Sequence, residues 1–145
     1  MFRRLLKAAL TLLVAIPLVV AVTPNSASAS GNGYVWACWI EPGEIINGGC
    51  GTFYQNGEIV LARDNRADGW GTRAQIQKLL PDSSGVLHWV NHSSACFDDT
   101  STGNTANGGM SCNYSINEGV KVRLHVWASN SGVYKWHVYS PSIEA

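Results

Sequence analysis

Residues 120–139 read VKVRLHVWASNSGVYKWHVY, and this stretch decides the fold class. On both sides of Asn130-Ser131-Gly132, apolar residues alternate with polar or aromatic ones at a period of two, which is typical of half-buried β-strands. The central segment suits a three-residue hairpin loop in which Gly132 takes the left-handed conformation. The sequence therefore predicts a hairpin in which Ser129 pairs with Val133.

That pairing predicts which side chains oppose each other across the hairpin. On the apolar face, the opposing pairs are Val126 with Trp136 and Leu124 with Val138. On the other face, the opposing pairs are Trp127 with Lys135, His125 with His137, and Arg123 with Tyr139. We therefore expect one apolar face and one basic, aromatic face, to which Lys121 also contributes.

The rest of the chain has similar short β-type runs separated by turn clusters, and no stretch has the 3.6-residue period of a helix. In the strand that starts at Trp70, Thr72, Ala74 and Ile76 share one face, while Arg73, Gln75 and Gln77 share the other. The expected strands span residues 34–40, 52–55, 58–63, 70–79, 86–91, 111–116, 120–128 and 133–139. The sequence predicts an all-β fold, a single small β-sandwich or barrel-like domain of antiparallel strands.

The N-terminal segment has the pattern of a secretory signal peptide. Arg3, Arg4 and Lys7 precede an apolar run of about 15 residues, shorter than the roughly 20 that a membrane-spanning helix needs. Small residues at positions 27–29 suit a signal peptidase. We predict a signal peptide at residues 1–29, Sec export rather than the twin-arginine route, and a secreted β domain at residues 30–145 without a stable membrane anchor.

The chain has four cysteines, Cys38, Cys50, Cys96 and Cys112, and an even number in an exported protein predicts two disulfides. Of the three possible pairings, we favour Cys38 with Cys50 and Cys96 with Cys112, because each closes a short glycine-rich or polar segment. No cysteine belongs to a C-x-x-C pair and no histidine lies at zinc-finger spacing, so we predict no metal site of that kind.

Charge and motifs exclude several classes of function. Ten basic residues less the three in the signal peptide leave seven against ten acidic residues, a net charge of about −3, which argues against general nucleic-acid binding. Asp64, Asp68 and Gly69 have the spacing of a calcium loop, but Arg66 and Gln75 occupy ligand positions of the EF-hand pattern. We interpret the segment as a turn, with a calcium site of a kind other than the EF-hand as the lesser alternative, and we predict no cofactor.

Several motifs give the chain a resemblance to known proteins: residues 64–69 (DNRADG) before a strand, Cys112-Asn113-Tyr114, Glu118-Gly119 and the closing hairpin. Together they resemble small secreted actinobacterial proteins of unknown function, over residues 58–139. The resemblance implies a disulfide-bonded, β-sandwich-like domain and implies no activity.

The basic, aromatic face of the closing hairpin is the main candidate site, because exposed rings stack on ligands while cationic groups meet negative ones. Its candidate binding residues are Arg123, His125, Trp127, Lys135, His137 and Tyr139. The alternative is an ordinary solvated face or one covered by a second sheet. We expect a secreted, non-enzymatic binding module for an extracellular carbohydrate, a cell-surface polymer or a protein.

Two other functions compete with that expectation. A polar loop closed by Cys96 and Cys112 would suit a protease inhibitor or an effector, because a rigid loop loses little entropy on binding. A small hydrolase is the third possibility, but the sequence has no G-x-S-x-G elbow or comparable signature. We therefore predict no catalytic residue.

Overall fold

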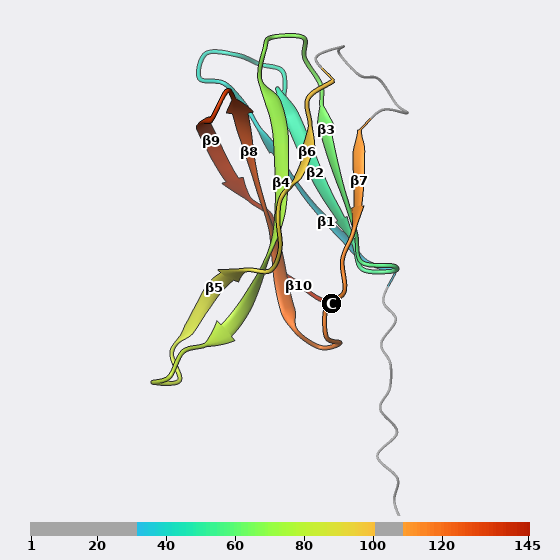
Figure 1. Ribbon diagram of the computed structural model, residues 1–145, viewed down its shortest axis with the longest axis vertical. Coiled ribbons are helices and arrows are strands. Elements are labelled where there is room, and N and C mark those ends of the chain that lie inside the picture. The colour runs from blue at the N-terminus through green and yellow to red at the C-terminus, as the bar shows by residue number, and fades with distance from the viewer. Residues whose placement is uncertain (1–31, 101–108) are drawn as a thin grey trace, which may run out of the picture.

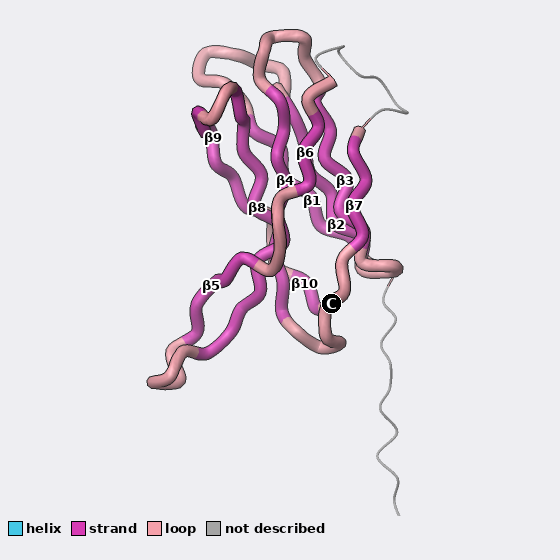
Figure 2. Tube along the Cα trace, viewed as in Figure 1, coloured by secondary structure: helices cyan, strands magenta, loops and turns pink. Residues whose placement is uncertain are grey.

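The computed structural model describes residues 32–100 and 109–145. Within these ranges it contains ten strands and no helix, and the predicted all-β fold of antiparallel strands is confirmed (Figure 2). In this part of the chain no helix is long and apolar enough to cross a bilayer. The predicted signal peptide, residues 1–29, lies outside the described residues.

The strands form two antiparallel sheets that pack face to face (Figure 1). The four-stranded sheet has the order β1-β2-β3-β7, with bounds β1 Tyr34–Trp39, β2 Gly49–Tyr54, β3 Ile59–Asp64 and β7 Met110–Asn113. The six-stranded sheet contains β4 Gly71–Pro81, β5 Leu87–Asn91, β6 Cys96–Asp98, β8 Lys121–Asn130, β9 Val133–Tyr139 and β10 Ile143–Glu144. Strands β4 and β8 pair at its centre. β5 and β6 pair with two stretches of β4, and β9 and β10 with two stretches of β8.

The core lies between the sheets, where β1, β2, β3, β4 and β8 bury alternate residues over most of their length. Its largest fully buried side chains are Trp39, Phe53, Val60, Ile76, Val122, Leu124 and Val126. Gly51 lets the sheets approach closely, because a Cβ atom there would lie 2.6 Å from Val126 Cγ2 and 2.8 Å from Ala74 Cβ. Since alternate residues of a strand point to opposite faces, the buried set also determines which side chains face the solvent.

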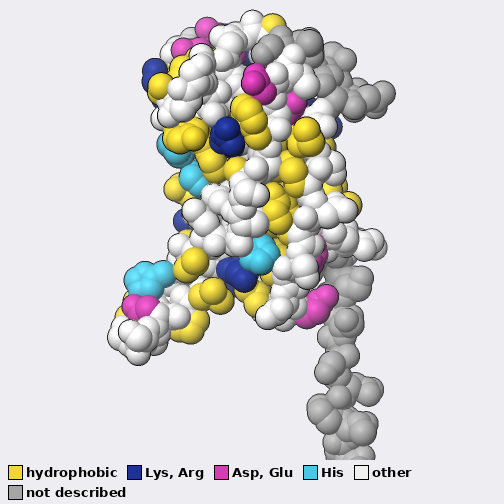
Figure 3. Space-filling view, in the orientation of Figure 1, with side chains coloured by type: hydrophobic (Ala, Val, Ile, Leu, Met, Phe, Trp, Pro, Cys, Tyr) yellow, Lys and Arg dark blue, Asp and Glu magenta, His cyan; other side chains and the backbone are white. Residues whose placement is uncertain are grey.

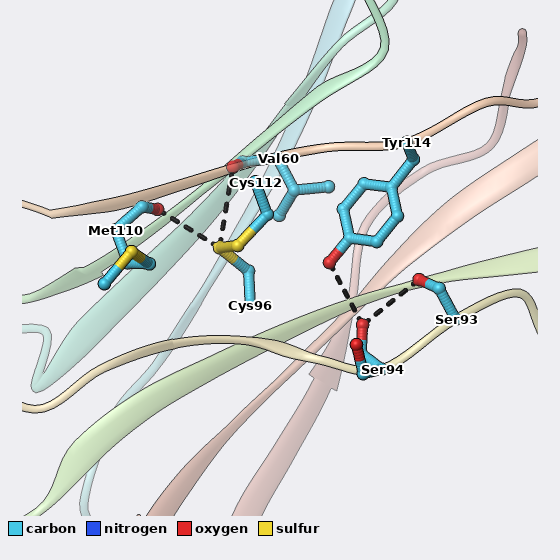
Figure 4. The surroundings of a disulfide bond; sticks show 7 residues. All are labelled: Val60, Ser93, Ser94, Cys96, Met110, Cys112 and Tyr114. Carbon is cyan, nitrogen blue, oxygen red and sulfur yellow. Dashed lines mark hydrogen bonds between the residues drawn. A yellow bond between two sulfur atoms is a disulfide. The ribbon is translucent and has the colours of Figure 1, made fainter.

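Both favoured disulfides, Cys38–Cys50 and Cys96–Cys112, are present. The first joins β1 to β2 within one sheet, and the second joins β6 of the six-stranded sheet to β7 of the other (Figure 4). Near the second bridge, the Tyr114 hydroxyl donates to the carbonyl of Ser94 at 3.0 Å. A further link between the sheets is the bond from the Asp64 amide to Asp98 Oδ2, at 2.8 Å.

The segment before β4 is a turn, as predicted. The Asp64 carboxylate accepts a hydrogen bond from the Arg66 amide, and the Asp68 carboxylate accepts one from the Trp70 amide. Gly69 has a φ of +83°, a backbone conformation that glycine adopts without strain. Both carboxylates therefore bond to backbone amides of the segment itself.

The closing hairpin differs from the prediction in its register. Its loop has two residues, Ser131 and Gly132, both with positive φ, and Asn130 pairs with Val133. This is the geometry of the tight turns whose twist matches that of paired strands. The predicted three-residue loop, in which Ser129 paired with Val133, is therefore wrong.

A β-bulge shifts the register again farther along the same hairpin. Ala128 pairs with Lys135 but Val126 pairs with Val138, so β9 contains one residue more than β8 between these pairs. Trp136 lies in the bulge and has a φ of 51°. An extra residue in one strand turns the next side chain to the opposite face. The predicted opposition of Val126 to Trp136 is wrong, although Trp136 still lies on the inner side of the sheet, stacked on Trp39 at 5.1 Å.

Beyond the sandwich, β4 and β5 continue as a two-stranded arm that projects from the body (Figure 1). The arm's pairing runs from Gln77 with Asn91 to Pro81 with Leu87. At its end Asp82 lies 2.9 Å from the His88 ring. Trp89, on β5, extends from the arm to the candidate site described next.

Candidate binding face

The outer side of the six-stranded sheet carries a group of aromatic, cationic and polar side chains, here called the ring face. It faces away from the four-stranded sheet, because the alternate residues of the same strands are buried in the core. In the space-filling view, hydrophobic, cationic and histidine side chains adjoin one another over β4, β6, β8 and β9 (Figure 3). The members of the ring face are Arg73, Gln75, Gln77, Trp89, Phe97, Arg123, His125, Trp127, Ser129, Tyr134, His137 and Tyr139.

The rings at the centre of this face stack on one another. His125 is central, with its ring centroid 4.4 Å from Trp127 and 4.6 Å from Tyr139. Trp127 also contacts His137 and, edge to face, Tyr134. Trp127 is only 8% exposed, whereas Tyr134 and Tyr139 are exposed. The tyrosines thus offer surface to a ligand, while Trp127 packs against Tyr134 and His125 packs against Tyr139.

Arg123 lies between two rings at one end of the face. Its guanidinium carbon is 4.4 Å from the Trp89 centroid and 4.2 Å from the Tyr139 centroid, and its Nε donates to Gln77 Oε1 at 2.9 Å. Partial burial lowers the pKa of Arg123 from its ordinary value, but an arginine keeps its proton at physiological pH. The side chain is therefore a fixed positive charge.

Arg73 is held in the same manner near the other end of the face. Its guanidinium carbon is 3.9 Å from the Phe97 centroid and 5.8 Å from the Tyr134 centroid, and its Nε donates to Ser129 Oγ at 3.0 Å. In the described part of the chain, the ion pairs join Arg66 to Glu44 and Asp68, and His88 to Asp82. None of them involves Arg73 or Arg123, so no described carboxylate neutralises either guanidinium through such a pair.

The two histidines between the arginines form a hydrogen-bonded pair. His125 Nε2 lies 2.9 Å from His137 Nδ1, so one of these nitrogens carries the shared hydrogen. Burial, followed by the nearby His137 and Arg123, lowers the pKa of His125 to about 4. At neutral pH the His125 ring is uncharged, which allows it to stack among its neighbours without repelling Arg123.

The structure brings together five of the six predicted site residues. Arg123, His125, Trp127, His137 and Tyr139 all lie on the ring face. His125 pairs with Tyr139 rather than with His137, and the predicted pairing of Arg123 with Tyr139 is wrong. The side-chain contacts between His125 and His137, and between Arg123 and Tyr139, nevertheless exist, because both connect diagonal neighbours.

Lys135 is the exception among the predicted site residues. It pairs with Ala128 instead of Trp127, and its Nζ lies 5.1 Å from the Trp70 centroid and 5.7 Å from that of Trp136. These rings pack against the core on the inner side of the sheet. The two-residue turn therefore separates Lys135 from the ring face, because it pairs Lys135 with a residue of the core face. Lys121 is exposed at the start of β8 and pairs with Glu144.

Sequence reasoning missed seven members of the ring face: Arg73, Gln75, Gln77, Trp89, Phe97, Ser129 and Tyr134. The alternation in β4 did place Arg73 opposite the core face. The sequence did not show that β4 pairs with β8. This pairing places Arg73 opposite Trp127 and Gln77 opposite Arg123. That pairing joins segments about fifty residues apart, and no local pattern specifies it.

Two other candidate sites gain no support from the geometry. The described residues contain no group of three or more histidine, cysteine, aspartate or glutamate side chains arranged to hold a metal ion. The loop between Cys96 and Cys112 falls largely at residues 101–108, outside the described residues.

No family model, curated protein or solved structure matches the chain.

Proposed function

We propose that this protein is a secreted binding module that holds an anionic polysaccharide on the ring face. The observation that carries the proposal is the pair of arginines, each placed between two rings and bonded through Nε, with no ion pair to a described carboxylate. The disulfides and the signal-peptide pattern of residues 1–29 support an extracellular location.

The way the arginines are held favours a charged ligand. A guanidinium whose faces contact rings and whose Nε is occupied keeps the edge formed by its Nη groups for a ligand, and that edge matches a carboxylate or sulfate in a two-point contact. Because neighbouring side chains already hold it, little conformational entropy is lost on binding. The exported part of the chain has a net charge of about −3, so attraction to a polyanion must come from this local arrangement.

The spacing of the arginines favours a polymer over a single small anion. Arg73 and Gln77 are four residues apart on β4, and Arg123 pairs with Gln77. At a strand rise of about 3.3 Å per residue, the two backbone positions are about 13 Å apart along the sheet. A polysaccharide with repeated negative charges reaches both arginines, and the exposed rings of Tyr134 and Tyr139 suit stacking against its sugars.

The test compares polygalacturonate with its fully methyl-esterified form, which has the same backbone without the charge. Isothermal titration of the processed protein should show binding to the acid form only, weakening as salt rises. Arg123→Gln and Arg73→Gln should each lower the affinity by about ten-fold or more, since a hydrogen bond to a charged group contributes about 1.5–3 kcal/mol.

Arg63→Gln is the matched control, because it removes one positive charge from β3 of the opposite sheet. It should leave the affinity for polygalacturonate nearly unchanged. Equal binding of the acid and ester forms, or an equal loss in the Arg63 variant and the Arg123 variant, would show that the ring face does not select anionic polymers.

A further inference from the structure

The outer side of the four-stranded sheet carries a second group of aromatic side chains, here called the aromatic platform. It consists of Tyr34 and Trp36 on β1 and Tyr54 on β2, which are 60%, 57% and 42% exposed. On these strands the alternate residues Val35, Ala37 and Phe53 are buried. The period of two therefore places all three large rings on the solvent side, opposite to the ring face.

The platform is held in place by the strands beneath it. Tyr34 pairs with Tyr54, and their ring centroids are 6.1 Å apart; Trp36, paired with Thr52, lies two residues farther along β1. At the other end of β1 the Cys38–Cys50 disulfide connects paired residues of the same two strands. At the near end, the Gln55 amide donates to the Gly33 carbonyl and the Gly33 amide to Gln55 Oε1. The pairing of β1 with β2, and with it the positions of the rings, is thus fixed at both ends of the two strands.

Two surface hollows border the platform. One surface hollow is lined by Tyr34, Val35, Trp36 and Pro141, and a second by Asn32, Gly33, Tyr54, Asn56 and Ile59. Neither hollow is lined by a charged side chain. Asparagine amides both donate and accept hydrogen bonds, as sugar hydroxyl groups do. The charge and hydrogen-bonding character of this surface therefore complements a neutral glycan.

We propose that the aromatic platform is a second binding site, and that its ligand is a neutral polysaccharide whose sugar rings stack on Trp36, Tyr34 and Tyr54. Rings about 7 Å apart along β1 contact successive parts of an extended chain. The amides in the second hollow bond to its hydroxyl groups. The site shares no residue with the ring face, so this inference stands or fails independently of the proposed function.

The test is sedimentation of the processed protein with microcrystalline cellulose and with chitin, two insoluble neutral polysaccharides. At least one of them should retain the protein in high salt, because no charge takes part. Trp36→Ala should lower the affinity for that polymer about ten-fold, since a ring at the centre of a contact surface contributes strongly to binding. Tyr34→Ala should lower it by a smaller factor.

Tyr139→Ala is the matched control, because it removes an exposed ring from the opposite sheet. It should leave retention on the neutral polymer unchanged, and circular dichroism of each variant should match the wild type, since none of these rings is in the core. Absence of retention on both polymers, or retention that Trp36→Ala does not reduce, would overturn the proposal. It would also be overturned if sedimentation velocity showed that Trp36→Ala abolishes a dimer, because the platform would then bind a second copy.

Discussion

Arg73 and Arg123 illustrate how neighbouring side chains on a sheet surface fix the position of a charge. They come from different strands, yet each has aromatic rings near both faces of its guanidinium and a neutral oxygen bonded to its Nε. A free arginine on a surface samples many rotamers, and ordering it on binding costs free energy. Here the neighbouring side chains have already restricted it.

At the same scale, His125 makes the stability of the protein depend on pH. Its folded-state pKa of about 4 lies below the 6.5 of an unperturbed histidine, so between these values the unfolded chain binds a proton that the folded chain does not. The contribution of His125 to stability is therefore complete above about pH 6.5 and is lost as the pH falls toward 4. We expect a loss of about 1–2 kcal/mol, less than the full shift implies, because solvent reaches part of the ring.

Urea unfolding at pH 7 and pH 4.5, followed by tryptophan fluorescence, measures this loss. His125→Phe keeps a stacked ring but removes the titrating group, so its free energy of unfolding should fall less between the two pH values than that of the wild type. Hydrogen bonds with Ser84 and His88 lower the pKa of Asp82 to about 2. Asp82 is present in both proteins. Equal pH dependence in the two proteins would refute the role given to His125.

At the scale of elements, the β8–β9 hairpin depends on the bulge at Trp136. A bulky residue with a positive φ is strained, by about 1–2 kcal/mol, and glycine is not. Removing the ring also removes its contacts with Trp39 and Trp70, at a cost of about 2–4 kcal/mol. We therefore expect Trp136→Gly to be more stable than Trp136→Ala by about 1 kcal/mol, the reverse of the usual order in a strand.

Chemical denaturation of both variants measures this difference, with Lys135→Gly and Lys135→Ala as the matched pair. The structure assigns Lys135 no positive φ, so at that position alanine should be the more stable of the two. If alanine is also the better residue at position 136, Trp136 does not have the backbone conformation described here.

The hairpin also shows what a sequence pattern predicts and where it stops. The period of two in residues 120–139 is a local property, and it correctly predicted both strands and the faces of Leu124, Val126 and His125. The turn type and the bulge depend on backbone angles at Ser131 and Trp136, residue types that do not favour positive φ. The register and the position of Lys135 were therefore wrong, while five of the six candidate site residues were placed correctly.

For the molecule as a whole, the pairing of β4 with β8 determines the candidate site. It places Arg73 beside Trp127 and, with the arm, puts Trp89 against Arg123. The four-stranded sheet carries the aromatic platform on the opposite side of the molecule. A domain with binding surfaces on both sides would connect two different polymers, which neither surface does alone.

The central claim is that Arg73 and Arg123 contact an anionic polymer directly. It is tested by following the arginine Nε–H resonances in nitrogen-15 NMR spectra while polygalacturonate is added to the processed protein. We predict that the signals of Arg73 and Arg123 shift together with one midpoint while the signal of Arg63 stays in place. Saturated binding of the polymer with both ring-face signals unmoved, or with Arg63 moving equally, would contradict the account.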